Sequence, residues 1–155
     1  MRDERVAGGG LVSVEEALES IYQEWLGEAP ESLRNDPLWK FEGYTRALLL
    51  FDWAWEDSGQ LVRDPRSRAM AGQLVRSAGS ISANIDEGFG RGIEAGEYVQ
   101  FLRYALGSAR ETRGWYFKSR HLLPPELLQQ RMMLCNKVIA LLVTGIKLRK
   151  AARQR

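Results

Sequence analysis

The sequence has very few of the residues that build covalent or metal-based sites. Only one of its 155 residues is a cysteine and only one is a histidine, at positions 135 and 121. A single cysteine excludes a disulfide framework and any site with several cysteine ligands, and a single histidine excludes a site with paired imidazoles. We therefore expect Cys135 to be an inert, small apolar residue on the core side of a helix, and we expect neither a metal nor a cofactor.

Long uncharged apolar stretches are also missing. In the C-terminal half the longest of them, residues 138–146, has nine residues, whereas a membrane-spanning helix needs roughly 20. The first residues do not follow the order of a basic segment and then an apolar one that marks a secretory signal. We therefore expect a soluble, cytoplasmic protein without a membrane partner.

The composition is typical of one globular domain, but its charge is unevenly distributed. Hydrophobic residues make up 45% and charged residues 27% of the chain, and the net charge is +2. Residues 1–60 carry 5 basic and 13 acidic side chains (5 − 13 = −8), and residues 61–155 carry 17 and 7 (17 − 7 = +10). Such an asymmetry indicates either an acid–base match within the molecule or a basic face for an anionic partner.

Local signals predict where several helices begin and end. Ser13 and Glu16 have the spacing of a capping box, which begins a short acidic helix. Residues 27–37, which contain two prolines, are expected to form a linker. Asp64 followed by a proline predicts the start of another helix, and the glycine-rich residues 88–92 predict its end in a turn.

Apolar spacing predicts an all-α fold. Beyond the linker, four segments repeat apolar residues at intervals of three and four, and no segment alternates with a period of two for long enough to predict a strand. Four helices with short connections pack as an antiparallel up-and-down bundle. We therefore expect a flexible arm, a short acidic helix and a linker (1–37), a four-helix bundle (38–150) and a basic tail (151–155).

The first and fourth bundle helices are apolar on a second side as well. The residues on these second sides include Trp53, Leu134, Val138, Leu141 and Leu148, together with Leu49, Leu50 and Leu127. A bundle core needs one apolar stripe per helix, so the surplus predicts burial against something else. Two elements could bury these apolar residues: the N-terminal helix of the same chain, or another subunit. For the second alternative, Trp53, Leu134, Val138, Leu141 and Leu148 are the candidate interface.

The second bundle helix carries a polar stripe, and its residues fit a family signature. Residues 73–91, QLVRSAGSISANIDEGFGR, resemble the signature Q-L-x-R-A-x-x-S-I-x-x-N-I-A-E-G-x-x-R of the 23S rRNA-intervening sequence protein family. The polar positions that match are Gln73, Arg76, Ser80, Asn84, Glu87 and Arg91. Residues 98–111 resemble the family's aromatic-rich third helix. Asp86 replaces the usual small residue, and residues 1–37 have no counterpart in the family pattern.

The resemblance covers about residues 38–150 and implies a compact bundle that assembles as a ring-like homopentamer. Family members are encoded within intervening sequences of bacterial ribosomal RNA genes or elsewhere in bacterial genomes. Related proteins are accessory variability determinants of diversity-generating retroelements, in which a basic pentamer binds RNA and a reverse transcriptase. The resemblance implies no catalytic residues, and it carries over the polar motif residues only as structural or interface positions.

Basic residues gather on the third and fourth bundle helices. The candidate nucleic-acid-binding residues are Arg103, Arg110, Arg113, Lys118, Arg120, Lys147, Arg149 and Lys150. Seventeen of the 22 basic residues are arginine, which suits bidentate contact with phosphate. Five copies in a ring would create a sizeable positive field. The alternative is that these residues form an ordinary solvent-exposed face, on which cations near the C-terminus of a helix interact favourably with the helix dipole.

These observations lead to two hypotheses from different classes. The first is a non-enzymatic homo-oligomer that binds RNA or a nucleoprotein partner such as a reverse transcriptase, through salt-sensitive contacts with the phosphate backbone. The second is a structural or protein-interaction scaffold whose basic body is masked by its own acidic N-terminal helix. An enzyme is not expected, because no nucleophile is paired with a base and because the neighbouring carboxylates at 86 and 87 diverge on a helix.

Overall fold

The structure, a computed structural model, describes residues 11–94 and 96–155, so most of the expected N-terminal arm lies outside the described residues. Its elements are α1 (Val14–Glu28), α2 (Glu31–Arg34), η1 (Pro37–Lys40), α3 (Glu42–Leu61), α4 (Arg68–Gly90), α5 (Gly96–Lys118), η2 (Ser119–His121) and α6 (Pro125–Arg153). No strand occurs within the two described ranges, and the all-α class is confirmed.

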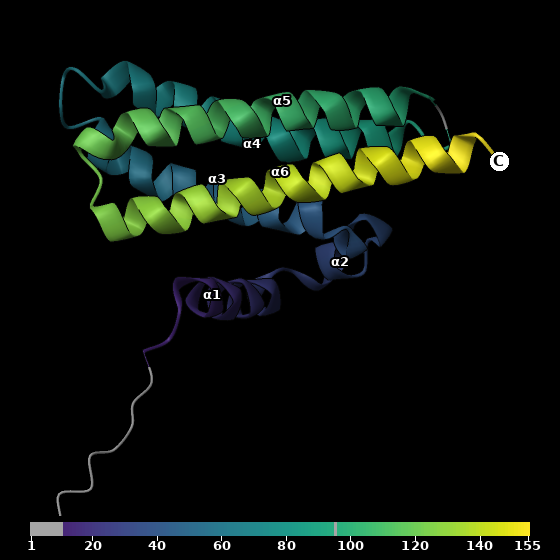
Figure 1. Ribbon diagram of the computed structural model, residues 1–155, viewed down its shortest axis with the longest axis horizontal. Coiled ribbons are helices and arrows are strands. Elements are labelled where there is room, and N and C mark those ends of the chain that lie inside the picture. Colours follow the sequence, from purple (N-terminus) through teal and green to yellow (C-terminus); the bar gives the residue numbers. More distant parts are fainter. Residues whose placement is uncertain (1–10, 95) are drawn as a thin grey trace, which may run out of the picture.

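The four long helices form the bundle, and α1 lies outside it. Helices α3 and α4, α4 and α5, α5 and α6, and α3 and α6 pack against each other in pairs, which closes the bundle. Figure 1 shows these helices side by side along the long axis, with α1 on one flank. Helix α6 continues through Arg153, so most of the expected basic tail is helical. No helix in the described part of the chain is both long and apolar enough to span a membrane.

The helix boundaries agree only in part with the local signals. The capping box is present: the Ser13 backbone N–H donates to the Glu16 carboxylate (2.8 Å), and the Glu16 N–H donates to the Ser13 hydroxyl (3.1 Å). Asp64 is not the cap of α4, which begins at Arg68. Its carboxylate accepts the Arg66 backbone N–H (2.9 Å) within a preceding turn, because a short acidic side chain readily bonds its own backbone two residues on. The expected linker contains the short helix α2.

Helix α4 continues further into the glycine-rich residues 88–92 than the sequence predicts. The helix continues through Gly90, and among the residues that the structure describes only Gly92 has a positive φ, of 107°. Gly88 therefore lies inside the helix, where it allows α5 to approach closely. A Cβ at Gly88 would lie 2.5 Å from the Cβ of Phe101, a distance that two carbon atoms do not tolerate.

The core of a single chain takes up most of the surplus apolar residues. Leu134 and Val138 are fully buried, and Trp53 is 8% exposed. Helix α1 packs on α3 and α6 and buries Leu18 and Tyr22 there. The interface assignment is therefore wrong for these three candidates, because the chain itself covers them. Of the other two, Leu141 is half-buried, and Leu148 is 65% exposed.

A buried ionic network joins three of the bundle helices. Asp57 on α3 accepts two hydrogen bonds from the Arg131 guanidinium on α6 (2.8 and 3.1 Å) and one from the Tyr116 hydroxyl on α5 (2.9 Å). The guanidinium also lies 4.0 Å from the ring centroid of Trp53. All four side chains are buried. The network therefore satisfies a charge pair that would otherwise be costly in the interior.

Candidate nucleic-acid interface

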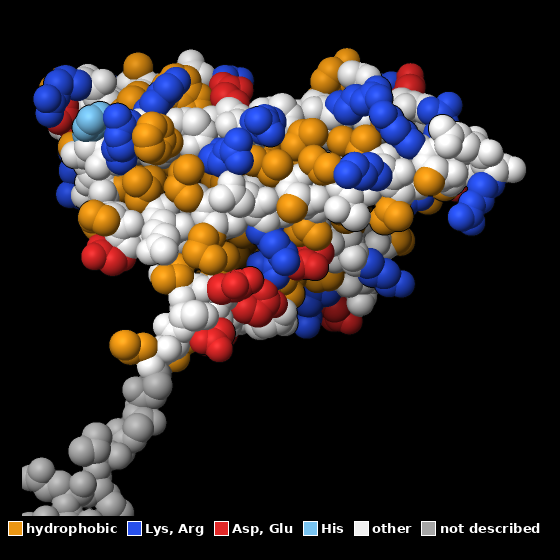
Figure 2. Space-filling view, in the orientation of Figure 1, with side chains coloured by type: hydrophobic (Ala, Val, Ile, Leu, Met, Phe, Trp, Pro, Cys, Tyr) orange, Lys and Arg blue, Asp and Glu red, His pale blue; other side chains and the backbone are white. Residues whose placement is uncertain are grey.

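Net positive and net negative charge lie on different parts of the molecule. Residues 96–155, which form α5, η2 and α6, carry 12 basic and 3 acidic side chains (12 − 3 = +9), whereas residues 11–94 carry 8 and 15 (8 − 15 = −7). In Figure 2, basic side chains spread over α5 and the end of α6, and acidic ones gather at α1. The division seen in the sequence is therefore also a division in space.

Helix α5 presents arginines toward solvent at intervals of one heptad. Arg103 and Arg110 are exposed, and two positions seven apart lie on the same side of a helix about 10 Å from each other. The Arg103 guanidinium donates a hydrogen bond to Gln100 (3.3 Å). Arg113 is half-buried and reaches across to Asn136 on α6 (3.0 Å), so its charge remains available while its position is constrained.

Two cations at the end of α5 lie over aromatic rings. The Lys118 ammonium lies 4.1 Å from the ring centroid of Trp115, and the Arg120 guanidinium lies 4.2 Å from that of Phe117. Both cations are exposed, and Phe117 itself is 52% exposed. The aromatic faces therefore hold the two charges in place without neutralising them.

Exposed aromatic rings among these arginines are functional candidates that sequence reasoning did not identify. Tyr104 and Phe117 on α5 are both 52% exposed. Phe117 follows Arg110 by seven residues, and Tyr104 is the direct neighbour of Arg103. The sequence signal that could have identified Phe117 is its position one heptad after Arg110 and two heptads after Arg103.

The basic residues near the end of α6 form a second group. Lys147 and Lys150 are exposed, whereas Arg149 is half-buried, with its guanidinium 5.4 Å from the ring centroid of Tyr98 on α5. Within residues 11–94 and 96–155, none of the eight candidate cations forms an ion pair. All eight charges, which we call the basic face, therefore lack an ion-pair partner in this part of the chain and are available to an anionic partner.

The described hydrogen bonds and ion pairs that link the acidic helix α1 to the bundle involve none of the eight candidate cations. Its Glu19 carboxylate pairs at 2.6 Å with Arg46 on α3, which is buried and is not one of the eight candidates. Trp25 of α1 donates its indole N–H to Asp52, also on α3 (2.7 Å). The described ion pair of α1 is thus with α3, and the α6 cation that, besides Arg46, lowers the pKa of Glu19, Lys137, is not one of the eight candidates. These contacts do not favour the self-masking hypothesis.

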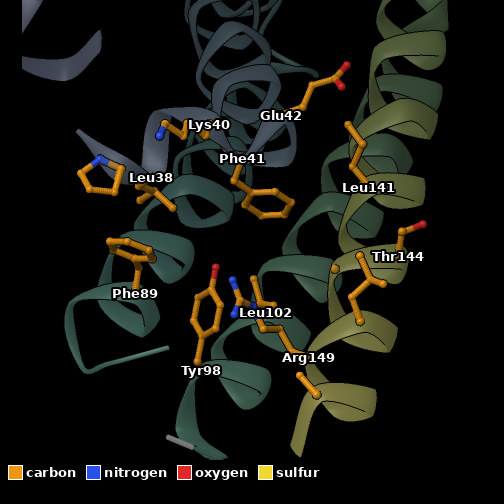
Figure 3. A pocket seen from close by; sticks show the side chains of 14 residues that line it. Leu38, Lys40, Phe41, Glu42, Phe89, Tyr98, Leu102, Leu141, Thr144 and Arg149 are labelled. Carbon is orange, nitrogen blue, oxygen red and sulfur yellow. The ribbon is translucent and has the colours of Figure 1, made fainter. Parts of the chain in front are cut away.

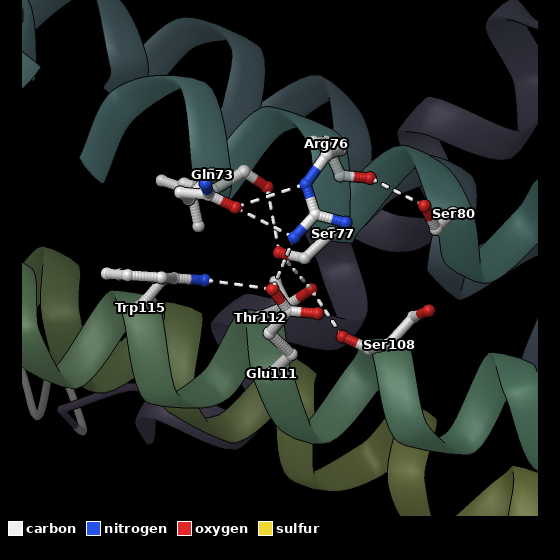
Figure 4. A network of polar contacts seen from close by, with 9 residues as sticks. Gln73, Arg76, Ser77, Ser80, Ser108, Glu111, Thr112 and Trp115 are labelled. Atoms are coloured by element: carbon white, nitrogen blue, oxygen red, sulfur yellow. Dashed lines mark hydrogen bonds and ion pairs between the residues drawn. The ribbon is translucent and has the colours of Figure 1, made fainter. Parts of the chain in front are cut away.

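The polar motif residues of α4 connect this helix to α5 (Figure 4). Arg76 donates to Gln73 (2.7 Å) and pairs with Glu111 on α5 (2.6 Å). The Glu111 carboxylate also accepts the indole N–H of Trp115 (3.2 Å). Beneath this pair, the Thr112 hydroxyl bonds the Ser77 hydroxyl (3.0 Å) in a buried position.

The rest of the motif stabilises α4 itself. Ser80 and Asn84 donate to the carbonyl oxygens four residues earlier, at 2.8 and 2.7 Å. Glu87 and Arg91 form an ion pair of 2.8 Å across one helical turn, as expected for a helix that continues that far. The motif residues therefore have structural roles in this chain, and the basic face lies elsewhere.

The geometry offers little for covalent or metal chemistry. Cys135 is completely buried, and burial raises the pKa of its thiol to about 12, so the thiolate is strongly disfavoured at neutral pH. The one histidine, His121, is exposed in η2. Among the residues that the structure describes, no group of three histidine, cysteine or acidic side chains is placed to hold a metal ion.

The comparison with known proteins fits both the motif and the bundle. The family model of the 23S rRNA-intervening sequence protein matches residues 40–144, from the end of η1 to most of α6. The chain belongs to this family. No curated protein matches it significantly. Helix α1 and the basic end of α6 lie outside the matched residues.

A solved structure shows the same fold. It is described as a protein of unknown function from the S23 ribosomal protein family of Bacteroides thetaiotaomicron, and it matches this family member with a TM-score of 0.59 and 23% sequence identity. The match covers 68% of this chain and 98% of that chain. At this identity the likeness concerns the fold alone, and nearly all of the other protein corresponds to part of this one.

Proposed function

We propose that this family member is a non-enzymatic, homo-oligomeric accessory protein that binds RNA through the basic face of α5 and α6. The observation that carries the proposal is the set of eight cations without an ion-pair partner among the described residues, on helices with a charge of +9. Lysine and arginine that replace the counterions of a phosphate backbone bind it with an affinity that falls steeply with salt.

The aromatic rings on the same helix favour RNA with unpaired bases. Tyr104 and Phe117 are half exposed and lie beside arginines. Unstacked bases gain free energy by stacking on aromatic side chains, whereas the grooves of duplex RNA do not admit them. A loop, bulge or single strand therefore fits this face better than a continuous duplex.

The oligomer is part of the proposal, because the family resemblance implies a homopentamer. Several large apolar side chains remain exposed on the single chain, including Trp55 (66%) and Leu148 (65%), and such residues are suited to subunit contacts. A ring would also repeat the basic face and strengthen its field. The mass of the protein in solution, measured by light scattering, tests this part: a pentamer is expected, and a monomer would contradict it.

The RNA proposal predicts a specific effect of charge removal on α5. The double variant Arg103→Gln/Arg110→Gln should bind a structured RNA with single-stranded loops more weakly, and the slope of log affinity against log salt should decrease by about two, because two phosphate contacts are lost. Fluorescence anisotropy over a salt series that starts at about 50 mM measures both quantities.

The matched control removes two exposed arginines from another part of the molecule. Arg63 and Arg68 lie between α3 and the start of α4, are exposed, and form no ion pair within the described ranges. Replacement of both by glutamine should leave the salt slope nearly unchanged. Equal losses in the two double variants, or no binding by the wild type at about 50 mM salt, would contradict the proposal.

A further inference from the structure

A cavity of about 600 Å³ opens at the end of the bundle where η1 and the start of α3 meet α5 and the end of α6. Its size lies within the usual range of small-molecule sites, roughly 300–1,000 Å³. The apolar part of its wall is formed mainly by Leu38, Phe41, Phe89, Leu102, Leu141 and Leu148. Figure 3 shows the labelled apolar side chains, all of these except Leu148, arranged from several helices around one common space.

One polar group points into this apolar space. Tyr98 is 3% exposed, and in Figure 3 its hydroxyl points toward the middle of the cavity, between Phe89 and Phe41. Among the described residues, this hydroxyl has no hydrogen-bond partner. Burial raises the pKa of Tyr98, so the group remains a protonated donor at neutral pH. No fully buried side-chain nitrogen or oxygen in the described residues lacks a partner, so this hydroxyl keeps some contact with solvent at the cavity. It is therefore available to donate to a ligand that carries an acceptor oxygen.

Positive charge accompanies the hydroxyl at the wall of the cavity. The Arg149 guanidinium lies over the Tyr98 ring, 5.4 Å from its centroid, and Lys40 lines the opposite side. The one lining carboxylate, that of Glu42, is held at 2.6 Å by Arg46. The cavity wall therefore combines an apolar body with a donor and an excess of cations.

We propose that this cavity binds a small molecule with an aliphatic body and a single carboxylate, the chemical class of a medium-chain fatty acid. The aliphatic body lies among the leucine and phenylalanine side chains, where it leaves water. The carboxylate accepts the Tyr98 hydroxyl and faces the Arg149 guanidinium, which makes a charge-assisted contact. Arg149 is also one of the eight candidate cations, so the cavity shares one residue with the proposed RNA-binding face. Binding of the small molecule is measured without RNA, so its failure is distinguishable from a failure of RNA binding.

The test is a titration of the full-length protein with decanoate and, for comparison, decanol, by isothermal calorimetry below the micelle concentration. Decanoate should bind saturably at one site per chain, and decanol about tenfold more weakly or not detectably, because it lacks the charge. Tyr98→Phe and Arg149→Gln should each weaken decanoate binding by about fivefold to tenfold, while Lys150→Gln, a neighbouring exposed cation that does not line the cavity, should not.

Three results would overturn the proposal. The first is no saturable decanoate binding by the wild type, and the second is equal binding of decanoate and decanol with no effect of either variant, which would indicate an unspecific apolar surface. The third is a fall in oligomer mass as decanoate binds, which would identify a second copy of the chain as the natural occupant. Arg149→Gln keeps the test decisive if Tyr98→Phe fails to fold, since Arg149 is only half-buried.

Discussion

At the scale of single side chains, the buried ion pair of Asp57 and Arg131 makes the fold sensitive to the loss of either partner. Asp57 and Arg131 are separated by 74 positions in the sequence and are each about 5% exposed. An ion pair of this kind contributes little compared with well-packed apolar residues, but the loss of one partner leaves a buried charge uncompensated. Stability should therefore depend strongly on the pair being complete.

Asp57→Asn should lower the free energy of unfolding by about 3–5 kcal/mol, because the Arg131 charge then has no buried counter-ion. Urea unfolding followed by circular dichroism measures the change. Glu56→Gln, at the exposed neighbouring position, is the control and should stay within about 0.5 kcal/mol of the wild type. A loss below about 1 kcal/mol in Asp57→Asn would mean that the network is not essential.

Gly88→Ala and Gly107→Ala should have opposite effects on thermal stability. At Gly88 the added Cβ would meet the Phe101 Cβ at 2.5 Å, so α4 and α5 must separate, at a cost of about 1–3 kcal/mol. At Gly107 the added Cβ meets nothing within 4 Å on the surface of α5, so the higher helix propensity of alanine should add up to about 1 kcal/mol. Calorimetric melting of both variants tests the pair, and shifts of the same sign would contradict it.

Among the helices, α1 differs from the rest because a few specific contacts hold it. Tyr22 bonds Thr45 (2.6 Å), Glu19 pairs with Arg46 (2.6 Å), and the Arg46 guanidinium lies 3.8 Å from the centroid of the Tyr22 ring. The bundle helices supply most of the apolar core, to which α1 adds only Leu18 and Tyr22 as buried residues. An element with few buried contacts opens more easily than the domain as a whole, so α1 should detach first.

The docking of α1 should weaken in acid. The hydrogen bond from Arg46 lowers the pKa of Glu19 below its ordinary value of 4.5, so its stabilising contribution is complete above pH 4.5 and is lost as the pH falls through the folded-state value. Glu19→Gln should have a similar effect at neutral pH. Hydrogen exchange at pH 7 should show faster exchange in α1 and unchanged exchange in α3–α6.

Glu24→Gln, exposed on the same helix, provides the control for this measurement. Its α1 amides should exchange as in the wild type, because the Glu24 carboxylate forms no ion pair among the described residues. If Glu19→Gln leaves the protection of α1 unchanged, the apolar contacts of Leu18 and Tyr22 are sufficient to hold the helix.

Local patterns predicted the fold well and the long-range contacts poorly. Apolar periodicity predicted the helices of the bundle, and the capping box at Ser13 predicted the start of α1, because both signals depend on neighbours within two turns. The Asp57–Arg131 pair could not be predicted, because nothing near either residue in the sequence indicates the partner. The sequence left two alternatives for what buries Trp53 and Val138, and only the structure shows that both are buried within the single chain. For the basic face, heptad spacing predicted Arg103 and Arg110 on one side of a helix, but whether their charges are free required the structure.

Across the entire chain, much of the charge division lies outside the residues matched by the family model. Residues 40–144 carry 14 basic and 11 acidic side chains (14 − 11 = +3). Residues 1–39 carry 3 and 9 (3 − 9 = −6), and residues 145–155 carry five basic ones and no acidic one (+5). The family bundle is thus nearly balanced in charge, and its two flanking segments carry the larger net charges, of opposite sign.

Removal of residues 1–37 should change RNA affinity by less than about threefold at about 150 mM salt. The described hydrogen bonds and ion pairs of α1 involve none of the eight candidate cations, and exposed charges further apart than about 8 Å are largely screened at that salt concentration. Anisotropy titrations of the truncated and full-length proteins, with helicity checked by circular dichroism, measure the difference. An increase above tenfold would restore the self-masking hypothesis.

The separation of α1 from the basic ends of α5 and α6 gives the molecule a large dipole moment despite its small net charge. In dilute buffer of low ionic strength, the acidic flank of one molecule attracts the basic face of another, and such dipoles associate head to tail. Added salt weakens this attraction. The protein should therefore dissolve better as salt is added, and its net charge of +2 is a poor guide to its colloidal behaviour.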